Sequence, residues 1–393
     1  MVKDLNHSTR VEWADAARGI AIVLVLLGHA CPPPYTTAFI YSFHMPLFFI
    51  LSGLFLKVDE PLGSLLPKKA RTLLVPFVIY NLVLLFSDWC IVALSPNHHE
   101  AVDITSRLLG TLTGWHGGLW DSALWFLPCL FVAQLLVVGS YHLARAHSRV
   151  CLLLWILLSL SGVAYCHWVG RPLPMSLDSA LVATGFLLMG RQVMRLNLRR
   201  EAWWYWAITA LIFVTTTLDN YYSLGGGTNH VDLSTDTLGQ PLNFYLAACG
   251  GSLLLIRGCQ ALAALNTAKN SSSFTLRSSS SISSTLTWLG RNSLAIYCLH
   301  RIPMNLGIAI WNATSLHSKL FTSSSPLITP TSLTALRALL LLLFTLLLLF
   351  PAVYVVNRWL PWTLGKGPRP NEYSRNTLFR LPRTPKGEGL QIL

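Results

Sequence analysis

Long apolar segments recur along the chain, and short polar connections separate them. A helix needs about 20 consecutive apolar residues to cross the hydrocarbon core of a bilayer. Ten segments approach that length, and we place them at 14–31, 36–56, 72–94, 120–142, 150–168, 175–194, 202–218, 241–263, 292–312 and 333–356. The pattern predicts an all-α polytopic membrane protein with about ten transmembrane helices.

The positions of the Lys and Arg residues orient these predicted helices. Connections on the cytoplasmic side of a membrane carry an excess of basic residues. If both termini lie in the cytoplasm, 22 of the 29 basic residues fall on that side, three fall outside and four fall within spans. We therefore predict cytoplasmic termini, a membrane domain over residues 1–362 and a basic cytoplasmic tail over residues 363–393.

Composition agrees with a membrane protein. Hydrophobic residues make up 53% of the chain and charged residues 11%, whereas charged residues are about 25% of a typical soluble protein. The cytoplasmic connections account for most of the net charge of +13, so the charge gives no reason to expect nucleic acid as a partner. The eight cysteines occur singly without zinc-ligand spacing, and we predict no metal site.

Two connections differ from the others in composition. Residues 271–284, SSSFTLRSSSSISS, contain nine serines, which favours a flexible cytoplasmic linker. Residues 219–240 contain three Asp, two Tyr and neither Lys nor Arg. That composition suits a sugar-binding rim, and it equally suits a solvated loop.

The first predicted span carries ionisable residues, which are rare inside membranes. It contains WADAARGIAIVLVLLGH at residues 13–29, with Asp15 and Arg18 at its start and His29 at its end. Arg18 and His29 are eleven positions apart, which is about three helical turns or roughly 16 Å on nearly one face. Charges within spans mark functional sites by default. The alternative is that Asp15 and Arg18 form an interfacial ion pair and that His29 lies at the membrane rim.

Further polar residues fall in the other spans. The second span carries His44 and Ser52, the fourth carries Trp125, and the ninth carries His300 and Arg301. Histidines in the outer halves of three separate spans indicate a polar cavity between helices.

A basic cluster precedes the third span. Lys68, Lys69 and Arg71 lie in the motif PKKARTLLVPF. Such a cluster is commonly an orientation signal. It can also bind the phosphates of a donor substrate, because Lys and Arg are the usual phosphate ligands.

These motifs together resemble the acyltransferase family 3 of integral membrane proteins, which O-acylate glycans. The resemblance rests on Arg18 and His29 separated by ten residues, on FHMPLFFILSG at 43–53 and on the spaced basic pair Lys68 and Arg71. WFLP at 125–128 and YCLH at 297–300 are similar to the branch that contains fucose acetylases and exopolysaccharide acetyltransferases. The family often has arginine at both positions of the basic pair. Lys68 keeps the charge of that arginine but lacks its bidentate fork.

The resemblance implies a fold, substrates and a location. The donor would be cytoplasmic acyl-CoA, most often acetyl-CoA, and no cofactor would stay bound. The acceptor would be a sugar hydroxyl of a cell-surface or lipid-linked polysaccharide. The protein would be a multi-pass protein of the plasma membrane, which is the inner membrane in bacteria.

The resemblance also implies roles for individual residues. His29 would be the general base, and Asp15 would hold Arg18 in place. The donor would meet a set of basic residues: Arg18, Lys68, Lys69 and Arg71. The cavity would be lined by His44, Ser52, Trp125, His300 and Arg301.

A secondary transporter is the main alternative to an enzyme. It would use the buried Asp, Arg and His residues as a path for substrate or protons. Transporters commonly show repeated halves with interrupted helices at matching positions. The sequence shows neither feature, which favours the enzyme.

Overall fold

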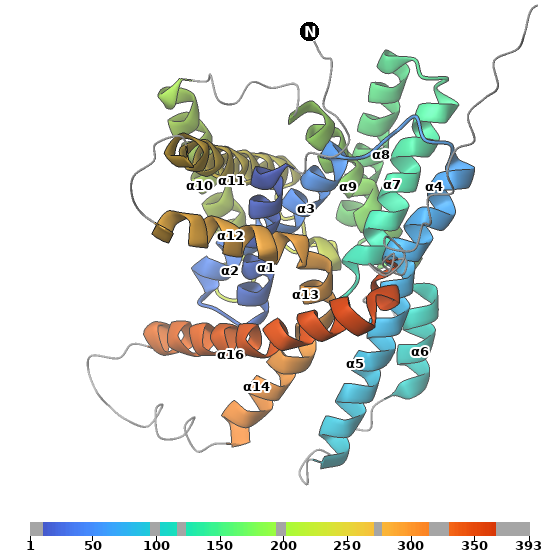
Figure 1. The fold of residues 1–393 in the computed structure, drawn as a ribbon. Coiled ribbons are helices and arrows are strands. Elements are labelled where there is room, and N and C mark those ends of the chain that lie inside the picture. Colours follow the sequence, from blue (N-terminus) through green and yellow to red (C-terminus); the bar gives the residue numbers. More distant parts are fainter. Residues whose placement is uncertain are drawn as a thin grey trace, which may run out of the picture.

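The computed structural model describes residues 11–94, 103–115, 123–193, 202–270, 277–313 and 330–366. Within these ranges the secondary structure is helical apart from one isolated bridge between Asp232 and Thr237. The all-α prediction is therefore confirmed. The helices in Figure 1 are α1 (Glu12–His29), α2 (Pro34–Tyr41), α3 (His44–Leu54), α4 (Leu62–Lys69), η1 (Ala70–Leu74), α5 (Val75–Leu94), α6 (Ile104–Thr113), α7 (Phe126–Leu143), α8 (Ser148–Trp168), η2 (Pro174–Ser176), α9 (Leu177–Val193), α10 (Trp203–Ser223), η3 (Leu233–Thr235), α11 (Pro241–Asn270), α12 (Arg277–Arg291), α13 (Ser293–Leu299), α14 (Arg301–Ala313), α16 (Pro330–Trp359) and η4 (Pro361–Leu364).

Each predicted span contains at least one of these helices. Among the described residues, six helical segments are long and apolar enough to cross a membrane, and a seventh qualifies if the bent pair α13 and α14 counts as one span. A polytopic membrane protein follows from these segments. The number of ten spans and the location of the termini stay predictions, because residues 1–10 and 367–393 lie outside the described ranges.

Helix α1 lies at the centre of the molecule. It packs against α2, α3, α11, α12, α13 and α16. Ala17, Ala21 and Leu26 on α1 are fully buried. The helix with the most unusual charges is therefore enclosed by protein.

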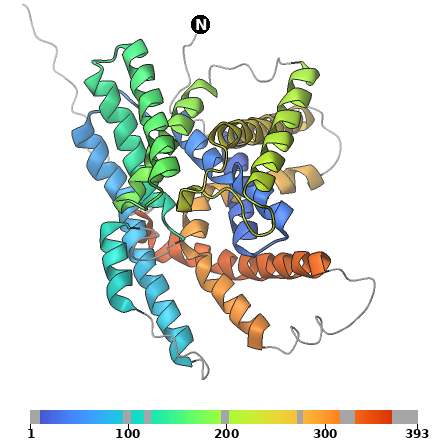
Figure 2. The same cartoon turned by 180° about the vertical axis from the view of Figure 1, so that it is seen from behind.

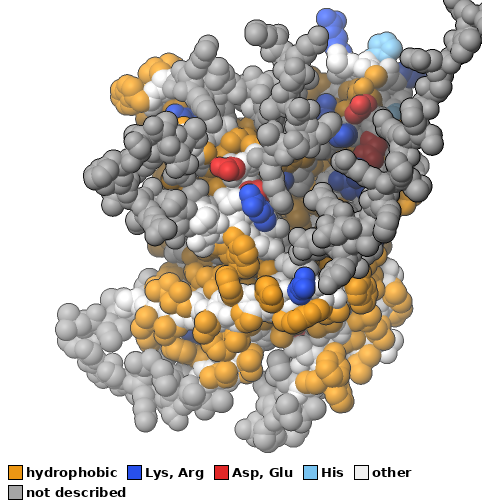
Figure 3. Space-filling model, viewed as in Figure 1, with side chains coloured by type: hydrophobic (Ala, Val, Ile, Leu, Met, Phe, Trp, Pro, Cys, Tyr) orange, Lys and Arg blue, Asp and Glu red, His pale blue; other side chains and the backbone are white. Residues whose placement is uncertain are grey.

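Helix α16 shows the opposite environment. It crosses the lower part of the view in Figure 1, and its Leu343, Leu347 and Phe350 are 54%, 71% and 62% exposed. Hydrophobic side chains form a broad band over this part of the surface in Figure 3, and the charged side chains in view are few. A surface of this kind is suited to lipid rather than to water.

Glycines allow α1 and α12 to cross in close contact. A Cβ atom added to Gly290 would lie 1.7 Å from the carbonyl oxygen of Asp15, and one added to Gly19 would lie 2.1 Å from that of Leu286. Small residues at crossings let two backbones approach and replace side-chain packing with direct contact. The crossing fixes the start of α1 against the end of α12.

The serine-rich segment is helical where the structure describes it, so the prediction of a flexible linker is wrong for residues 277–284. Residues 271–276 lie outside the described ranges. The serine count hid a helical pattern, because Ile282, Leu286 and Leu289 recur at spacings of four and three. Leu286 and Leu289 pack against the core.

Two predicted spans are interrupted, which the sequence analysis did not anticipate. The second span breaks at Ser42 and Phe43, between α2 and α3. The ninth breaks at His300, where α13 and α14 meet at a bend of 43°. Pro46 is the third residue of α3. The backbone N–H groups of the first turn have no partner within a helix, so a proline at this position costs no helical hydrogen bond.

The last described segment extends the folded region slightly. Thr363 in η4 hydrogen-bonds Tyr80 at 2.9 Å, and Leu364 is 1% exposed. The folded part thus continues past residue 362. The predicted tail lies outside the described ranges from residue 367 onward.

Candidate active site

Three histidines lie around the end of α1: His29 on α1, His44 on α3 and His300 at the junction of α13 and α14. The rings of His29 and His300 stack with centroids 5.1 Å apart. His44 and His300 are 4% and 0% exposed, whereas His29 keeps part of its surface accessible. The structure thus brings together side chains that are up to 271 positions apart in the chain.

The two helix breaks position two of these histidines. His44 Nδ1 lies 2.8 Å from the carbonyl oxygen of Ile40, and His300 Nδ1 lies 2.7 Å from that of Tyr297. A carbonyl oxygen only accepts hydrogen bonds, so Nδ1 donates in both rings, and Nε2 is then an acceptor in the neutral imidazole. His300 Nε2 is buried without a hydrogen-bond partner. Each break therefore supplies a carbonyl that fixes the orientation of one ring.

A small cavity, which we call the histidine cavity, lies beside His29. Its volume is about 40 Å³, enough for one or two groups the size of a water molecule. Its lining comes from α1, α2, α3, α13 and two connections: Val25, His29, Tyr41, His44, Met45, Ala123, Trp125, Asp232, Ser234 and Tyr297. Tyr41, Asp232 and Tyr297 are not among the cavity residues predicted from the sequence. Only the composition of the 219–240 connection hinted at Asp232.

A second cavity, which we call the apolar cavity, is a neighbour of the first. Its volume is about 240 Å³, and it shares Met45 and Tyr297 with the histidine cavity. Its other lining residues are mostly apolar: Ile22, Phe48, Ser52, Thr72, Leu73, Phe126, Leu127, Leu130, Ser293 and Leu294. The Tyr297 hydroxyl donates to the carbonyl oxygen of Ala123, which holds the shared wall in place. Ser52 thus lines the apolar cavity rather than the cavity of the histidines.

The start of α1 holds a three-residue ion cluster. Asp15 is 2% exposed and lies 3.3 Å from Arg18 Nη1 and 3.3 Å from Arg291 Nε. The Arg18 guanidinium carbon lies 5.0 Å from the centre of the Phe55 ring. The sequence predicts the pair of Asp15 and Arg18, but it shows Arg291 only as one of the cytoplasmic charges. Arg18 precedes Ile22 of the apolar cavity by one helical turn.

The basic cluster borders the apolar cavity through η1. Thr72 lines that cavity and directly follows Arg71, which is exposed. Lys68 Nζ pairs with Glu60 at 3.1 Å, and Lys69 is partly buried. Arg301 is also partly buried, and it lines neither the apolar nor the histidine cavity.

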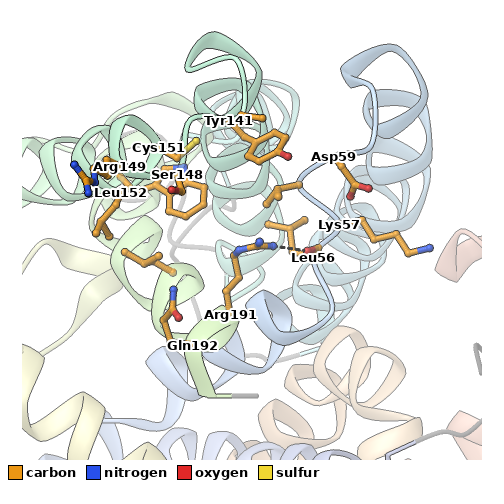
Figure 4. Close-up of a pocket in the computed structure, with 14 residues that line it drawn as sticks. Leu56, Lys57, Asp59, Tyr141, Ser148, Arg149, Cys151, Leu152, Arg191 and Gln192 are labelled. Atoms are coloured by element: carbon orange, nitrogen blue, oxygen red, sulfur yellow. Dashed lines mark hydrogen bonds between the residues drawn. The ribbon is translucent and has the colours of Figure 1, made fainter. Parts of the chain in front are cut away.

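A third cavity, which we call the Arg191 cavity, has a volume of about 710 Å³. Arg191 lies inside it, donates to the carbonyl oxygen of Leu56 at 3.1 Å and has its guanidinium carbon 5.8 Å from the centre of the Trp155 ring. Figure 4 shows Lys57 and Arg149 at opposite edges of this space. Lys57 and Arg149 lie at the rim and Arg191 lies inside, so the three cations do not converge on one point.

The connection between α10 and α11 is anchored near the histidine cavity. Ser179 donates to the carbonyl oxygen of Leu233 at 2.7 Å, and Cys166 donates to Asp236 at 3.2 Å. Burial, and then the nearby Asp178 carboxylate, raise the pKa of Asp236 to about 7. In Figure 2 this connection passes over α1 and α2.

Comparison with protein families decides what class of protein this is. The family model of the acyltransferase 3 group, described as an acyltransferase domain, matches residues 11–355. The chain belongs to the acyltransferase 3 family. It is therefore a multi-pass membrane acyltransferase, and the resemblance of its motifs to this family is confirmed. No curated protein and no solved structure matches the chain.

Proposed function

We propose that this acyltransferase moves an acyl group, preferably acetyl, from acyl-CoA to a sugar hydroxyl of a cell-surface or lipid-linked polysaccharide. One observation carries the proposal. An apolar cavity of about 240 Å³ and a small polar cavity lined by His29 are neighbours, with Met45 and Tyr297 lining both. A transferase needs such an arrangement, because its two substrates must meet at one catalytic group.

The apolar cavity suits the thin arm of an acyl-CoA. Its volume of about 240 Å³ is too small for a whole acyl-CoA, and its apolar lining suits the acyl group and the adjoining end of the pantetheine arm. Lys68, Lys69 and Arg71 border the cavity at Thr72, where they would bind the phosphates left outside. Arg18 would support the donor one turn before Ile22. These positions favour entry of the donor from the basic side of the protein.

The histidine cavity suits the acceptor hydroxyl. His29 would remove the hydroxyl proton as the oxygen attacks the thioester carbon. The new C–O bond forms while the C–S bond breaks, and the proton then passes from His29 to the departing CoA sulfur. General base catalysis of this kind is worth about 10²–10⁴ in rate. His300 would hold the His29 ring by stacking, and the buried Trp125 would help to exclude water.

The proposed location follows from the two substrates. Acyl-CoA is cytoplasmic and surface glycans are assembled outside, so the enzyme would act across the plasma membrane, the inner membrane in bacteria. Its partners would then be acyl-CoA, a glycan and the bilayer, and no cofactor would remain bound between turnovers.

Transfer of radiolabelled acetyl from acetyl-CoA to extractable glycan in membrane vesicles tests the proposal. We expect label with the wild type and at least a 100-fold loss with His29→Ala. His167→Ala is the matched control, because His167 is exposed on α8 and should leave transfer unchanged. Equal labelling with and without His29 would overturn the site. Movement of a glycan precursor across the vesicle membrane without any new bond would instead support the transporter.

A further inference from the structure

Asp232 brings an uncompensated carboxylate into the histidine cavity. Its side chain is half-buried and lines the cavity together with Ser234. Its Oδ1 accepts the backbone N–H of Ser234 at 2.8 Å. None of the ion pairs between described residues includes Asp232. Removing a carboxylate from water without a counter-ion is costly, so its retention here requires a reason.

The turn that carries Asp232 is held by its own backbone. The N–H of Asp232 donates to Thr237 at 2.8 Å, and the N–H of Thr237 donates back to Asp232 at 3.0 Å. The Ser179 hydroxyl binds the carbonyl oxygen of Leu233 and fixes the turn to α9. The second carboxylate oxygen of Asp232 is therefore not needed to close the turn. A carboxylate accepts about four hydrogen bonds, which leaves most of its capacity for a ligand.

The groups around Asp232 suit a polyhydroxylated ligand. Tyr41 and Trp125 line the same cavity and provide aromatic walls for the carbon-bound hydrogens beside the reacting hydroxyl. Tyr41 is itself held by the rings of His44 and His230, with centroids 4.9 and 4.3 Å away. His29 and His44 add imidazole groups to the lining. Carboxylate, aromatic and imidazole groups thus meet in a space that admits only the reacting end of an acceptor.

We infer that Asp232 is the acceptor-binding residue, which receives hydrogen bonds from the hydroxyl next to the one that is acylated. This inference rests on the proposed function, since it assumes that the acceptor is a sugar. The carboxylate repels an anionic group at the same place. The sugar residue that receives the acyl group is therefore neutral or amino-substituted, and not a uronic or sialic acid.

The test uses the full-length enzyme in vesicles, acetyl-CoA and the glycan that becomes labelled in the preceding assay. Asp232→Asn keeps the size of the side chain and removes the charge. We expect it to raise the KM for the glycan at least tenfold, because hydrogen bonds to charged groups contribute that much, and to leave the KM for acetyl-CoA unchanged. Asp232→Glu should recover part of the loss.

Asp219→Asn is the matched control. Asp219 is bonded to Asn243 and lies outside the lining of the histidine cavity, so both KM values should stay at wild-type levels. Acid hydrolysis of the labelled glycan then identifies the modified sugar. An unchanged KM for the glycan in Asp232→Asn, or label on an acidic sugar, would overturn this inference while the proposed function stands. Absence of any His29-dependent labelling in the wild type would instead remove the proposed function itself.

Discussion

The two ends of α1 differ in whether the polar groups there have partners within the protein. At the start of the helix, the buried Asp15 carboxylate lies 3.3 Å from both Arg18 and Arg291. At the end of the helix, His29 faces a cavity that also contains the uncompensated Asp232 carboxylate. One end satisfies its charges within the protein, and the other leaves acceptors unsatisfied.

This difference separates a structural role from a chemical one. Buried charges that are paired contribute little net stability but are destabilising when one partner is lost. Buried acceptors without partners lower stability unless a ligand supplies the missing donors. The start of α1 should therefore respond to mutation mainly through folding, and the end mainly through turnover. Three predictions test this comparison.

The largest effect is expected at the crossing of α1 and α12. Gly290→Ala places a methyl group 1.7 Å from the carbonyl oxygen of Asp15, so the two helices must separate. We expect the free energy of unfolding to fall by about 3 kcal/mol, as in strongly overpacked cores. Thermal unfolding in detergent measures it.

Gly258→Ala in α11 is the matched control, since no atom lies within 4 Å of a Cβ there. Its stability should equal or slightly exceed that of the wild type. Unchanged stability in Gly290→Ala would mean that α1 and α12 do not cross at these glycines.

A smaller effect is expected at Asp15. Asp15→Asn removes the carboxylate that pairs with the Arg18 and Arg291 guanidinium groups. Both guanidinium groups are partly exposed, so hydration by water replaces part of the lost interaction. We expect a loss of about 1–2 kcal/mol in the free energy of unfolding. Among folded molecules, kcat should be unchanged, and the KM for acetyl-CoA should rise no more than about fivefold, as for a partly exposed ion pair.

The additional removal of Arg291 should restore part of the stability lost in Asp15→Asn, because it removes a cation that would otherwise lie beside a neutral amide. If Asp15→Asn kept full stability and lost kcat, the start of α1 would belong to the chemistry, and the comparison would fail.

The smallest effect concerns the anchor of the Asp232 turn. The pKa of Asp236 is about 7 in the folded protein, above its ordinary value of 3.8. Between pH 3.8 and about pH 7 the Asp236 carboxyl is deprotonated in the unfolded chain but protonated in the folded protein. The stability of the anchored turn therefore falls as pH rises through this range and stays constant above about pH 7.

Hydrogen exchange over residues 228–240, corrected for intrinsic rates, should therefore show less protection at pH 8 than at pH 5. Asp236→Asn should remove this dependence, because an amide does not titrate in the range. Asp219→Asn should behave as the wild type does. Equal protection of the wild type at both pH values would contradict the proposed anchor.

Local patterns in the sequence were enough for the fold class and for the central helix. Apolar runs located a helix within every predicted span, and the charges of Asp15 and Arg18 pointed to α1. These features are local, since helical period and span length depend on neighbouring residues. The roles assigned to the site residues stay predictions.

The remaining features depend on contacts between distant parts of the chain. Arg291 reaches Asp15 across 276 positions, and no spacing in a single sequence reports such a contact. The helix breaks at Phe43 and His300 were missed because each lies inside a segment of spanning length and neither falls on a Gly or a Pro that would signal an interruption. Asp232 was missed because loop composition does not show which of three aspartates faces the cavity.

The contact between α1 and α12 joins residues that the ribosome makes at very different times. Arg291 is made 276 residues after Asp15, which at about 5–20 residues per second is roughly 15–55 s later. During that interval the first helix must wait in the membrane with an acidic side chain and without its final neighbour. Arg18, one turn away and already present, is the cation that accompanies Asp15 through that delay. The local pair thus protects a nascent helix before the finished protein encloses it.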